Sequence, residues 1–213
     1  MSFKIIGAGL SPFVRKTRVF FAEKGLDYEL EPLLPFGVSD EYKAKSPLGK
    51  IPCLEHDGRP LPDSSVICAY VERLNPEPAF YPADPWDFAQ ALWLEEYADG
   101  ALVGAGIPIF QGRVITRLLG KDVDEAQAKQ GEEGIEPFCD YLESRLADDR
   151  AYLVGPGITI ADIATASPFV NFAHGGWEPD AGRWPKLAAY LGRILSRPSF
   201  KALIEEEKAG LPA

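Results

Sequence analysis

Residues 3–32 read FKIIGAGLSPFVRKTRVFFAEKGLDYELEP, and this stretch decides the fold. The short apolar run Phe3–Gly7 predicts a buried strand. Ser11 and Pro12 are residue types preferred where a helix begins, and the apolar spacing after them predicts a helix to about Lys24. Tyr28 to about Pro32 predicts a second strand. Strand, helix and strand within about 30 residues form a βαβ unit, so the two strands are expected to run parallel.

The rest of the first half completes a small sheet. Leu54–Leu61 predicts two short antiparallel strands joined at Asp57-Gly58, a residue pair that favours hairpin turns. Apolar spacing after Ser64 predicts another helix. With an optional helix before the hairpin, the order is strand, helix, strand, helix, strand, strand, helix.

Four prolines between residues 76 and 85 predict a linker, because proline disrupts both helices and strand ladders. Only helical periodicity follows it. We therefore expect an α/β domain over residues 1–76, a linker over 77–85 and an all-α domain over 86–213. The expected helical stretches are 86–119, 125–146, 160–173, 185–195 and 199–208.

Composition excludes several classes of function. A chain of 213 residues with 46% hydrophobic residues can bury a core, and we find no stretch apolar and long enough to span a membrane. The net charge of −10, of which −9 lies after residue 80, disfavours nucleic acid as a partner. Three scattered cysteines and two distant histidines offer no disulfide framework, metal site or hydrolytic triad. A reducing cytoplasm is the predicted location.

Three segments of the first domain have both structural and functional interpretations. Ser11-Pro12 and Asp63-Ser64 are ordinary helix starts, and the proline of Ile51-Pro52 is ordinary at the beginning of a strand. A serine hydroxyl at a helix N-terminus can, however, also donate to an anion, including a thiolate. The residues alone leave both interpretations open.

The motifs together resemble those of the cytosolic glutathione transferases, over almost the whole chain. Ser11-Pro12-Phe13-Val14-Arg15-Lys16, Pro47-Leu48-Gly49-Lys50-Ile51-Pro52 and Asp63-Ser64 are similar in order and spacing to that family's glutathione-site motifs. Residues 158–163, ITIADI, resemble its capping motif in the helical domain, where Asp162 can reach back to the amide of Thr159. The resemblance implies a thioredoxin-like domain followed by an α-helical bundle, in a homodimer.

The resemblance also implies roles for individual residues. Ser11 would donate to the sulfur of glutathione, and cis-Pro52 would expose the backbone of Ile51 to the cysteinyl part. Other classes carry a cysteine at this position or a tyrosine in the early loop between strand and helix. Glutathione would be the co-substrate, with no metal. The other expected glutathione contacts are Phe13, Lys50, Asp63, Ser64 and, from the neighbouring subunit, Asp99.

A glutathione transferase that adds the thiolate to a small apolar electrophile is the leading prediction. The alternatives are a glutathione-dependent disulfide or peroxide reductase, an isomerase, and a glutathione-binding stress or interaction protein without turnover. Cys53 is weighed as a nucleophile, although a buried position in the core is expected. Candidates for the electrophile-binding wall are Phe13, Trp93, Tyr97, Ile107 and Phe110.

Overall fold

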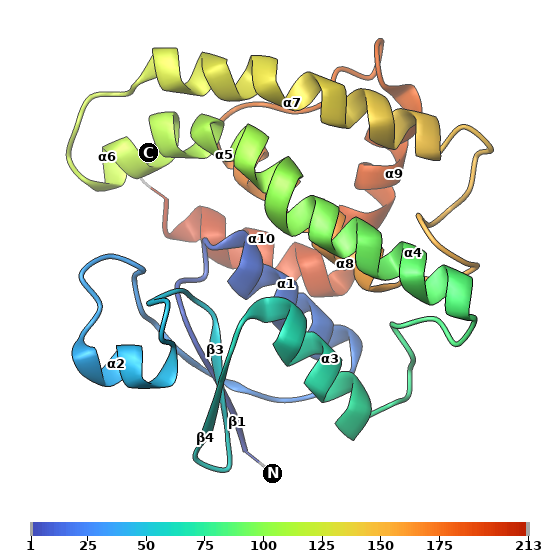
Figure 1. Cartoon of the computed structure of the whole chain (residues 1–213). Helices are drawn as coiled ribbons and strands as arrows, with labels where there is room; N and C mark the ends of the chain where they lie inside the picture. The colour runs from blue at the N-terminus through green and yellow to red at the C-terminus, as the bar shows by residue number, and fades with distance from the viewer. Residues whose placement is uncertain (1, 212–213) are drawn as a thin grey trace. The chain divides into compact units, whose positions relative to one another are not determined.

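A computed structural model describes residues 2–211 and divides the chain into two compact units, residues 1–80 and 81–213 (Figure 1). We call them the N-terminal unit and the C-terminal unit. The predicted fold class is confirmed: a thioredoxin-like α/β unit is followed by an all-α unit.

The N-terminal unit is built on a four-stranded mixed sheet in the order β2-β1-β3-β4. β1 (Phe3–Ile6) pairs in parallel with β2 (Glu29–Glu31), as the βαβ pattern predicts, and antiparallel with β3 (Cys53–His56). The hairpin to β4 (Arg59–Pro62) turns at Asp57 and Gly58, where φ is +49° and +76°. These positive φ values are what an Asp-Gly turn supplies.

Three helices accompany this sheet. α1 (Pro12–Glu23) and α3 (Ser64–Leu74) pack together, and the short α2 (Asp40–Lys45) lies on the other side of the strands in Figure 1. Gly25, with φ of +66°, ends α1 as a left-handed cap. β2 is shorter than expected: only Glu29–Glu31 pair with β1, and the predicted end positions Tyr28 and Pro32 lie outside the strand.

The end of α1 is tied to the chain beyond α3. The buried Lys24 ammonium donates to the carbonyl oxygens of Asn75 and Pro78, at 2.6 and 2.7 Å, and pairs with Glu72. All three partners lie between Glu72 and Pro78. Lys24 therefore holds the end of α3 and the residues after it against the end of α1.

The helical run expected over residues 86–119 is continuous but not uniform. It comprises α4 (Pro85–Glu96), a π-helical turn at Tyr97–Leu102, α5 (Val103–Phe110), a second π-helical turn at Gln111–Ile115, and α6 (Thr116–Leu118). Apolar periodicity did not reveal the π turns, because their residues keep helical backbone angles at both ends.

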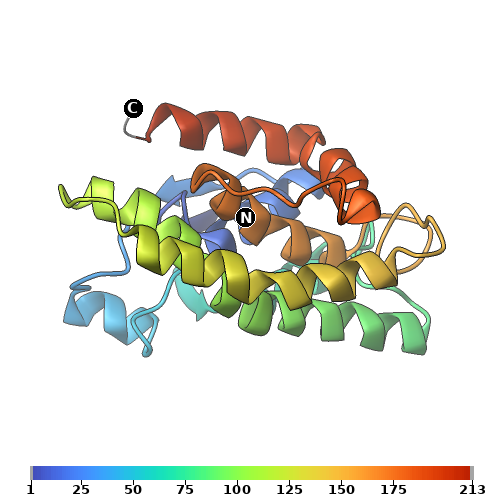
Figure 2. The same ribbon diagram turned by 90° about the horizontal axis from the view of Figure 1, so that it is seen from above.

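The remaining helices agree closely with the predicted stretches. They are α7 (Glu125–Arg145), α8 (Ile160–His174), α9 (Pro185–Leu195) and α10 (Pro198–Ala209). α8 is central to the C-terminal unit: residues 160–172 are all buried, it packs against α4 and α5, and Figure 2 shows it in orange among the other helices.

The start of α8 is anchored by a buried carboxylate. Asp162 accepts hydrogen bonds from the backbone amides of Leu153 and Thr159, both at 2.8 Å, from the Thr159 hydroxyl, and from Tyr190 at 2.9 Å. The predicted capping box is therefore present. Burial raises the pKa of Asp162, while the four donors act in the opposite direction.

Among residues 2–211 no helix is both long enough and apolar enough to cross a membrane.

Candidate functional site

Three loop segments lie at the same end of three adjacent strands, β1, β3 and β4. Strand register places Ile6, the last residue of β1, opposite Cys53, which in turn lies opposite Pro62 at the end of β4. Ile51-Pro52 directly precedes Cys53, Asp63-Ser64 directly follows Pro62, and Ser11 lies five residues after Ile6. The sheet therefore gathers the three predicted glutathione-site motifs at one edge of the N-terminal unit.

Close backbone contacts hold these segments together. The amide of Asp63 donates to the carbonyl oxygen of Pro52 at 3.3 Å. A Cβ atom at Gly7 would lie 2.6 Å from Val14 and 3.3 Å from Ile51, so only glycine fits at the end of β1.

Ser11 is the N-cap of α1. Its hydroxyl oxygen accepts a long hydrogen bond of 3.4 Å from the Val14 amide, and the side chain is only half-buried. Pro12 occupies the first helical position, and the first turn carries no acidic residue. The hydroxyl therefore lies at the positive end of the α1 dipole and can donate its hydrogen to an anion.

Lys16 adds a buried positive charge one turn further along α1. Its ammonium donates to the hydroxyl of Ser65 at 3.0 Å, and this contact ties α1 to the first turn of α3. Sequence reasoning missed this contact, because Lys16 and Ser65 lie 49 residues apart in the chain.

The loop before β3 presents a free backbone. The Ile51-Pro52 peptide bond is cis, as the resemblance implied, and within residues 2–211 the Ile51 amide and carbonyl have no hydrogen-bond partner. Tyr42 and Ser46 both donate to the carbonyl oxygen of Lys50 at 2.8 Å, which fixes the loop and leaves the Lys50 side chain exposed. Burial raises the pKa of Tyr42 to about 12, so its hydroxyl stays a donor.

Asp63, rather than Ser64, is the N-cap of α3. One of its carboxylate oxygens accepts from the amides of Ser65 and Val66, at 3.0 and 3.2 Å, and its backbone has φ of +80°. A positive φ is costly for a non-glycine residue and is found where the surrounding structure imposes it.

Ser64 consequently keeps two unused donors. In the part of the chain that the structure describes, neither its amide nor its hydroxyl donates to another group, although the residue has a relative exposure of only 4%. A free N–H and a free O–H at the N-terminus of an 11-residue helix form a receptor for a carboxylate.

The cysteines do not contribute to this site chemically. Cys53, Cys68 and Cys139 all lie within the described residues, are buried, and form no disulfide bond. Burial raises the pKa of Cys53, and it raises the pKa of Cys139 to about 12. A catalytic cysteine needs the opposite shift, so Cys53 is a core residue, as expected.

The helical candidates are spread along one long helical run. Trp93 and Tyr97 pack together with ring centroids 6.1 Å apart, and Tyr97 also contacts Phe138 and Tyr141. Phe110 is buried with 4% exposure, whereas Ile107 is half-buried. Since 17 residues of helix span about 25 Å, Trp93 and Phe110 do not form one continuous wall.

Phe13 and Asp99 complete the set of predicted residues. Phe13 is half-buried in the first turn of α1, and Asp99 is half-buried in the π-helical turn after α4.

Comparison with known proteins identifies relatives for both units. Residues 5–79 match the family model described as glutathione S-transferase, N-terminal domain, and residues 124–193 match that of the C-terminal domain. The chain is 31% identical to the uncharacterized GST-like protein YibF of Escherichia coli over 97% of this chain and 100% of that protein. It is 26% identical to a maleylacetoacetate isomerase of Rattus norvegicus, covering 87% and 84% of the two chains.

A solved structure supports the same relationship. A glutathione S-transferase of Methylobacterium radiotolerans, solved in complex with glutathione sulfonate, matches with a TM-score of 0.78 and 29% identity. The match covers 96% of this chain and 95% of that one.

Proposed function

This chain belongs to the glutathione S-transferase family, and on that premise we propose that it binds glutathione, stabilises the thiolate with Ser11 and adds it to an apolar electrophile. The observation that carries the proposal is the set of unused polar groups at one edge of the sheet. Ser11, Ile51 and Ser64 offer a donor for a sulfur anion, an extended backbone and a carboxylate receptor, in that order across the edge.

The energetics of thiolate formation suit this arrangement. A free thiol has a pKa of about 8.5, and lowering it by about two units requires about 2.7 kcal/mol of preferential stabilisation of the anion. One hydrogen bond to a charged group contributes about 1.5–3 kcal/mol, and the helix dipole adds about 0.3–1 kcal/mol. The Ser11 hydroxyl at the start of α1 therefore suffices without a metal or a general base.

The tripeptide follows the same edge in this proposal. Ser64 takes the γ-glutamyl carboxylate with its free amide and hydroxyl, and the second carboxylate oxygen of Asp63 is left for the γ-glutamyl ammonium. The Ile51 backbone pairs with the cysteinyl residue, and exposed Lys50 meets the glycyl carboxylate. Phe13 lies beside the thiol, and Asp99 of a second subunit completes the γ-glutamyl contacts.

The electrophile site is proposed from apolar side chains that keep some exposed surface. Phe13, Tyr97 and Ile107 are half-buried, and Trp93 is 53% exposed. Phe110, with 4% exposure, offers a ligand little surface of its own.

Two other activities keep support from the relatives and the fold. An isomerase uses the same bound thiolate to add to a double bond reversibly, and one relative is a maleylacetoacetate isomerase. A reductase is less favoured, because position 11 is serine and all three cysteines are buried.

Parallel assays with an aryl halide, hydroxyethyl disulfide, a peroxide and a cis-enone would separate these activities. Glutathione binding without turnover in any of them would indicate a binding protein and contradict the transferase proposal.

We expect Ser64→Ala to raise the dissociation constant of glutathione about tenfold, equivalent to about 1.4 kcal/mol. The reason is the loss of one donor to the γ-glutamyl carboxylate, while Asp63 still caps α3. Isothermal titration calorimetry measures the effect. Ser39→Ala, which removes the serine cap of α2 in the same unit, is the matched control and should leave the affinity unchanged. Equal affinities of Ser64→Ala and wild type would exclude this carboxylate site.

We also propose a homodimer, because α4 carries large apolar side chains that a single chain leaves exposed. Trp86 and Phe88 are 72% and 40% exposed, whereas Leu102 and Val103 further along are buried. A two-fold contact would cover the same exposed patch on both subunits. Light scattering at micromolar concentration should return about twice the chain mass of 23.3 kDa. A monomeric mass together with full activity would contradict the dimer and any role of Asp99 in a neighbouring site.

A further inference from the structure

The N-terminal unit holds a buried histidine whose contacts the glutathione motifs do not use. His56 ends β3, directly before the Asp57-Gly58 turn, and has a relative exposure of 5%. The Nδ1 atom of its ring lies 2.8 Å from the hydroxyl oxygen of Tyr70 on α3, and a carboxylate oxygen of Asp57 lies 3.5 Å from its Nε2 atom. The imidazole ring therefore lies between a carboxylate and a phenol.

Packing and the turn hold this group of residues in place. The ring of Phe3, on the neighbouring strand β1, packs against the imidazole with ring centroids 4.5 Å apart and an interplanar angle of 31°. Asp57 is fixed by the turn, where its φ is +49°, and its other carboxylate oxygen accepts a hydrogen bond of 3.4 Å from the Ser2 amide. The imidazole therefore keeps one face on Phe3 and its two nitrogens toward Asp57 and Tyr70.

The two ring nitrogens of His56 have different roles. Nε2 is buried and has no hydrogen-bond partner within residues 2–211, and Asp57 is the carboxylate that faces it. An ionised carboxylate can only accept hydrogens, so it stabilises the neutral imidazole that carries its hydrogen on Nε2. Nδ1 is then the acceptor, and the Tyr70 hydroxyl donates to it. A base that accepts from a nucleophile and is oriented by a third group is the arrangement that activates nucleophiles.

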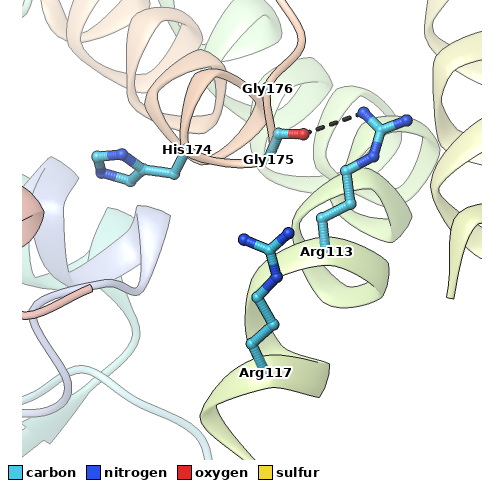
Figure 3. A pocket seen from close by; sticks show the side chains of 5 residues that line it. All are labelled: Arg113, Arg117, His174, Gly175 and Gly176. Atoms are coloured by element: carbon cyan, nitrogen blue, oxygen red, sulfur yellow. Dashed lines mark hydrogen bonds between the residues drawn. The ribbon is translucent and has the colours of Figure 1, made fainter. Parts of the chain in front are cut away.

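The other histidine lacks this arrangement. His174 ends α8, and it lines a pocket together with Arg113, Arg117, Gly175 and Gly176 (Figure 3). Its Nε2 atom lies 2.8 Å from the Glu207 carboxylate, and both side chains are buried. In the part of the chain that the structure describes, the hydrogen bond to a phenol therefore distinguishes His56.

We infer that Tyr70 is a site of covalent modification by electrophiles that carry a leaving group, with His56 as its base and Asp57 as the group that orients the base. With an aryl sulfonyl fluoride, the phenol oxygen attacks the sulfur atom, an O–S bond forms, the S–F bond breaks and fluoride leaves. The phenol proton passes to Nδ1 of His56.

The position of Tyr70 suits this reaction and keeps it apart from the glutathione site. Tyr70 is half-buried, so its side chain keeps some surface in contact with solvent while its hydroxyl meets a buried base. It lies six residues after Ser64, which corresponds to about 9 Å along α3. The inference therefore does not depend on glutathione or on the proposed transferase activity.

The test exposes the full-length protein, without glutathione, to benzenesulfonyl fluoride at pH 7 and follows the labelling of each tyrosine over time by peptide mass spectrometry. Tyr152 is the internal reference, because it is also half-buried and its hydroxyl has no partner among residues 2–211. Tyr70 should be labelled at least tenfold faster than Tyr152, since a positioned base typically contributes about 100–10,000-fold. Tyr70→Phe should remove the fast labelling and leave the slower sites unchanged.

Two variants test the base and its orientation. His56→Gln keeps a side chain that can accept from Tyr70 but cannot take up its proton, and Asp57→Asn removes the charge while keeping a residue pair that favours the turn. Each should slow the labelling of Tyr70 relative to Tyr152 by about tenfold or more. Asp40→Asn is the matched control, because Asp40 is also an exposed aspartate of the N-terminal unit, and it should leave this ratio unchanged.

Circular dichroism checks that the variants fold. Asp57 is exposed, so its variant decides the question even where the substitution of buried His56 prevents folding. The inference is overturned if Tyr70 of the wild type is labelled no faster than Tyr152, if Asp57→Asn is labelled at Tyr70 as fast as wild type, or if a folded His56→Gln is.

Discussion

Asp162→Ala is expected to lower the free energy of unfolding by about 3–5 kcal/mol, because it leaves several buried donors without an acceptor. The carboxylate is fully buried and accepts from Leu153, Thr159 and Tyr190. Each orphaned buried donor costs about 1–3 kcal/mol. Denaturation by urea, followed by circular dichroism, measures the effect as a lower midpoint.

Asp124→Ala is the matched control for this change. Asp124 also caps a helix, but it is exposed and accepts only from the Gln127 amide, at 2.9 Å. Its removal should cost about 1 kcal/mol, the usual value for an exposed cap. If the two substitutions cost the same, the network around Asp162 is not what holds the start of α8.

Ser11→Ala is expected to slow conjugation of an aryl halide about 10–100-fold while changing the affinity for glutathione little. The hydroxyl acts on the sulfur anion and not on the carboxylates that dominate binding. The pKa of bound glutathione should rise accordingly. An ultraviolet absorbance titration of the thiolate measures that shift directly, independently of the second substrate.

The structural role of Ser11 needs a control, since the same substitution removes a helix cap. Ser39→Ala removes an equivalent cap from α2, where the Tyr42 amide lies 3.2 Å from the Ser39 hydroxyl oxygen. It should cost similar stability and leave the thiolate titration unchanged. A Ser11→Ala enzyme with the wild-type thiolate pKa would remove Ser11 from the mechanism.

The fold was largely predictable because local signals and tertiary structure agree. The parallel βαβ unit, the Asp57-Gly58 turn and the capping box at Thr159 each depend on residues close together in the sequence. These are features for which turn chemistry and helix caps have a direct sequence signature. The two π-helical turns lack such a signature and were missed.

The candidate site was only partly predictable for the same reason. The motifs at Ser11, Ile51-Pro52 and Asp63-Ser64 could be read, but not that Asp63 caps α3 and leaves Ser64 with free donors. The contact of Lys16 with Ser65 joins residues far apart in the chain, and periodicity carries no information about such contacts. Helical spacing also does not reveal that Phe110 is buried, and which of the apolar candidates contact an electrophile stays a prediction.

Because Ile6, Cys53 and Pro62 are aligned across three strands, the N-terminal unit should tolerate an inserted residue at some positions and not at others. One residue added within β3 would displace the Ile51-Pro52 loop by about 3.4 Å along the strand and turn the side chains to the opposite face. The same residue added at Asp57-Gly58 would lengthen only the hairpin tip, which lies at the other end of both strands. A spectroscopic label or affinity tag should therefore be attached at the tip, which lies at the opposite end of the strands from the three loops.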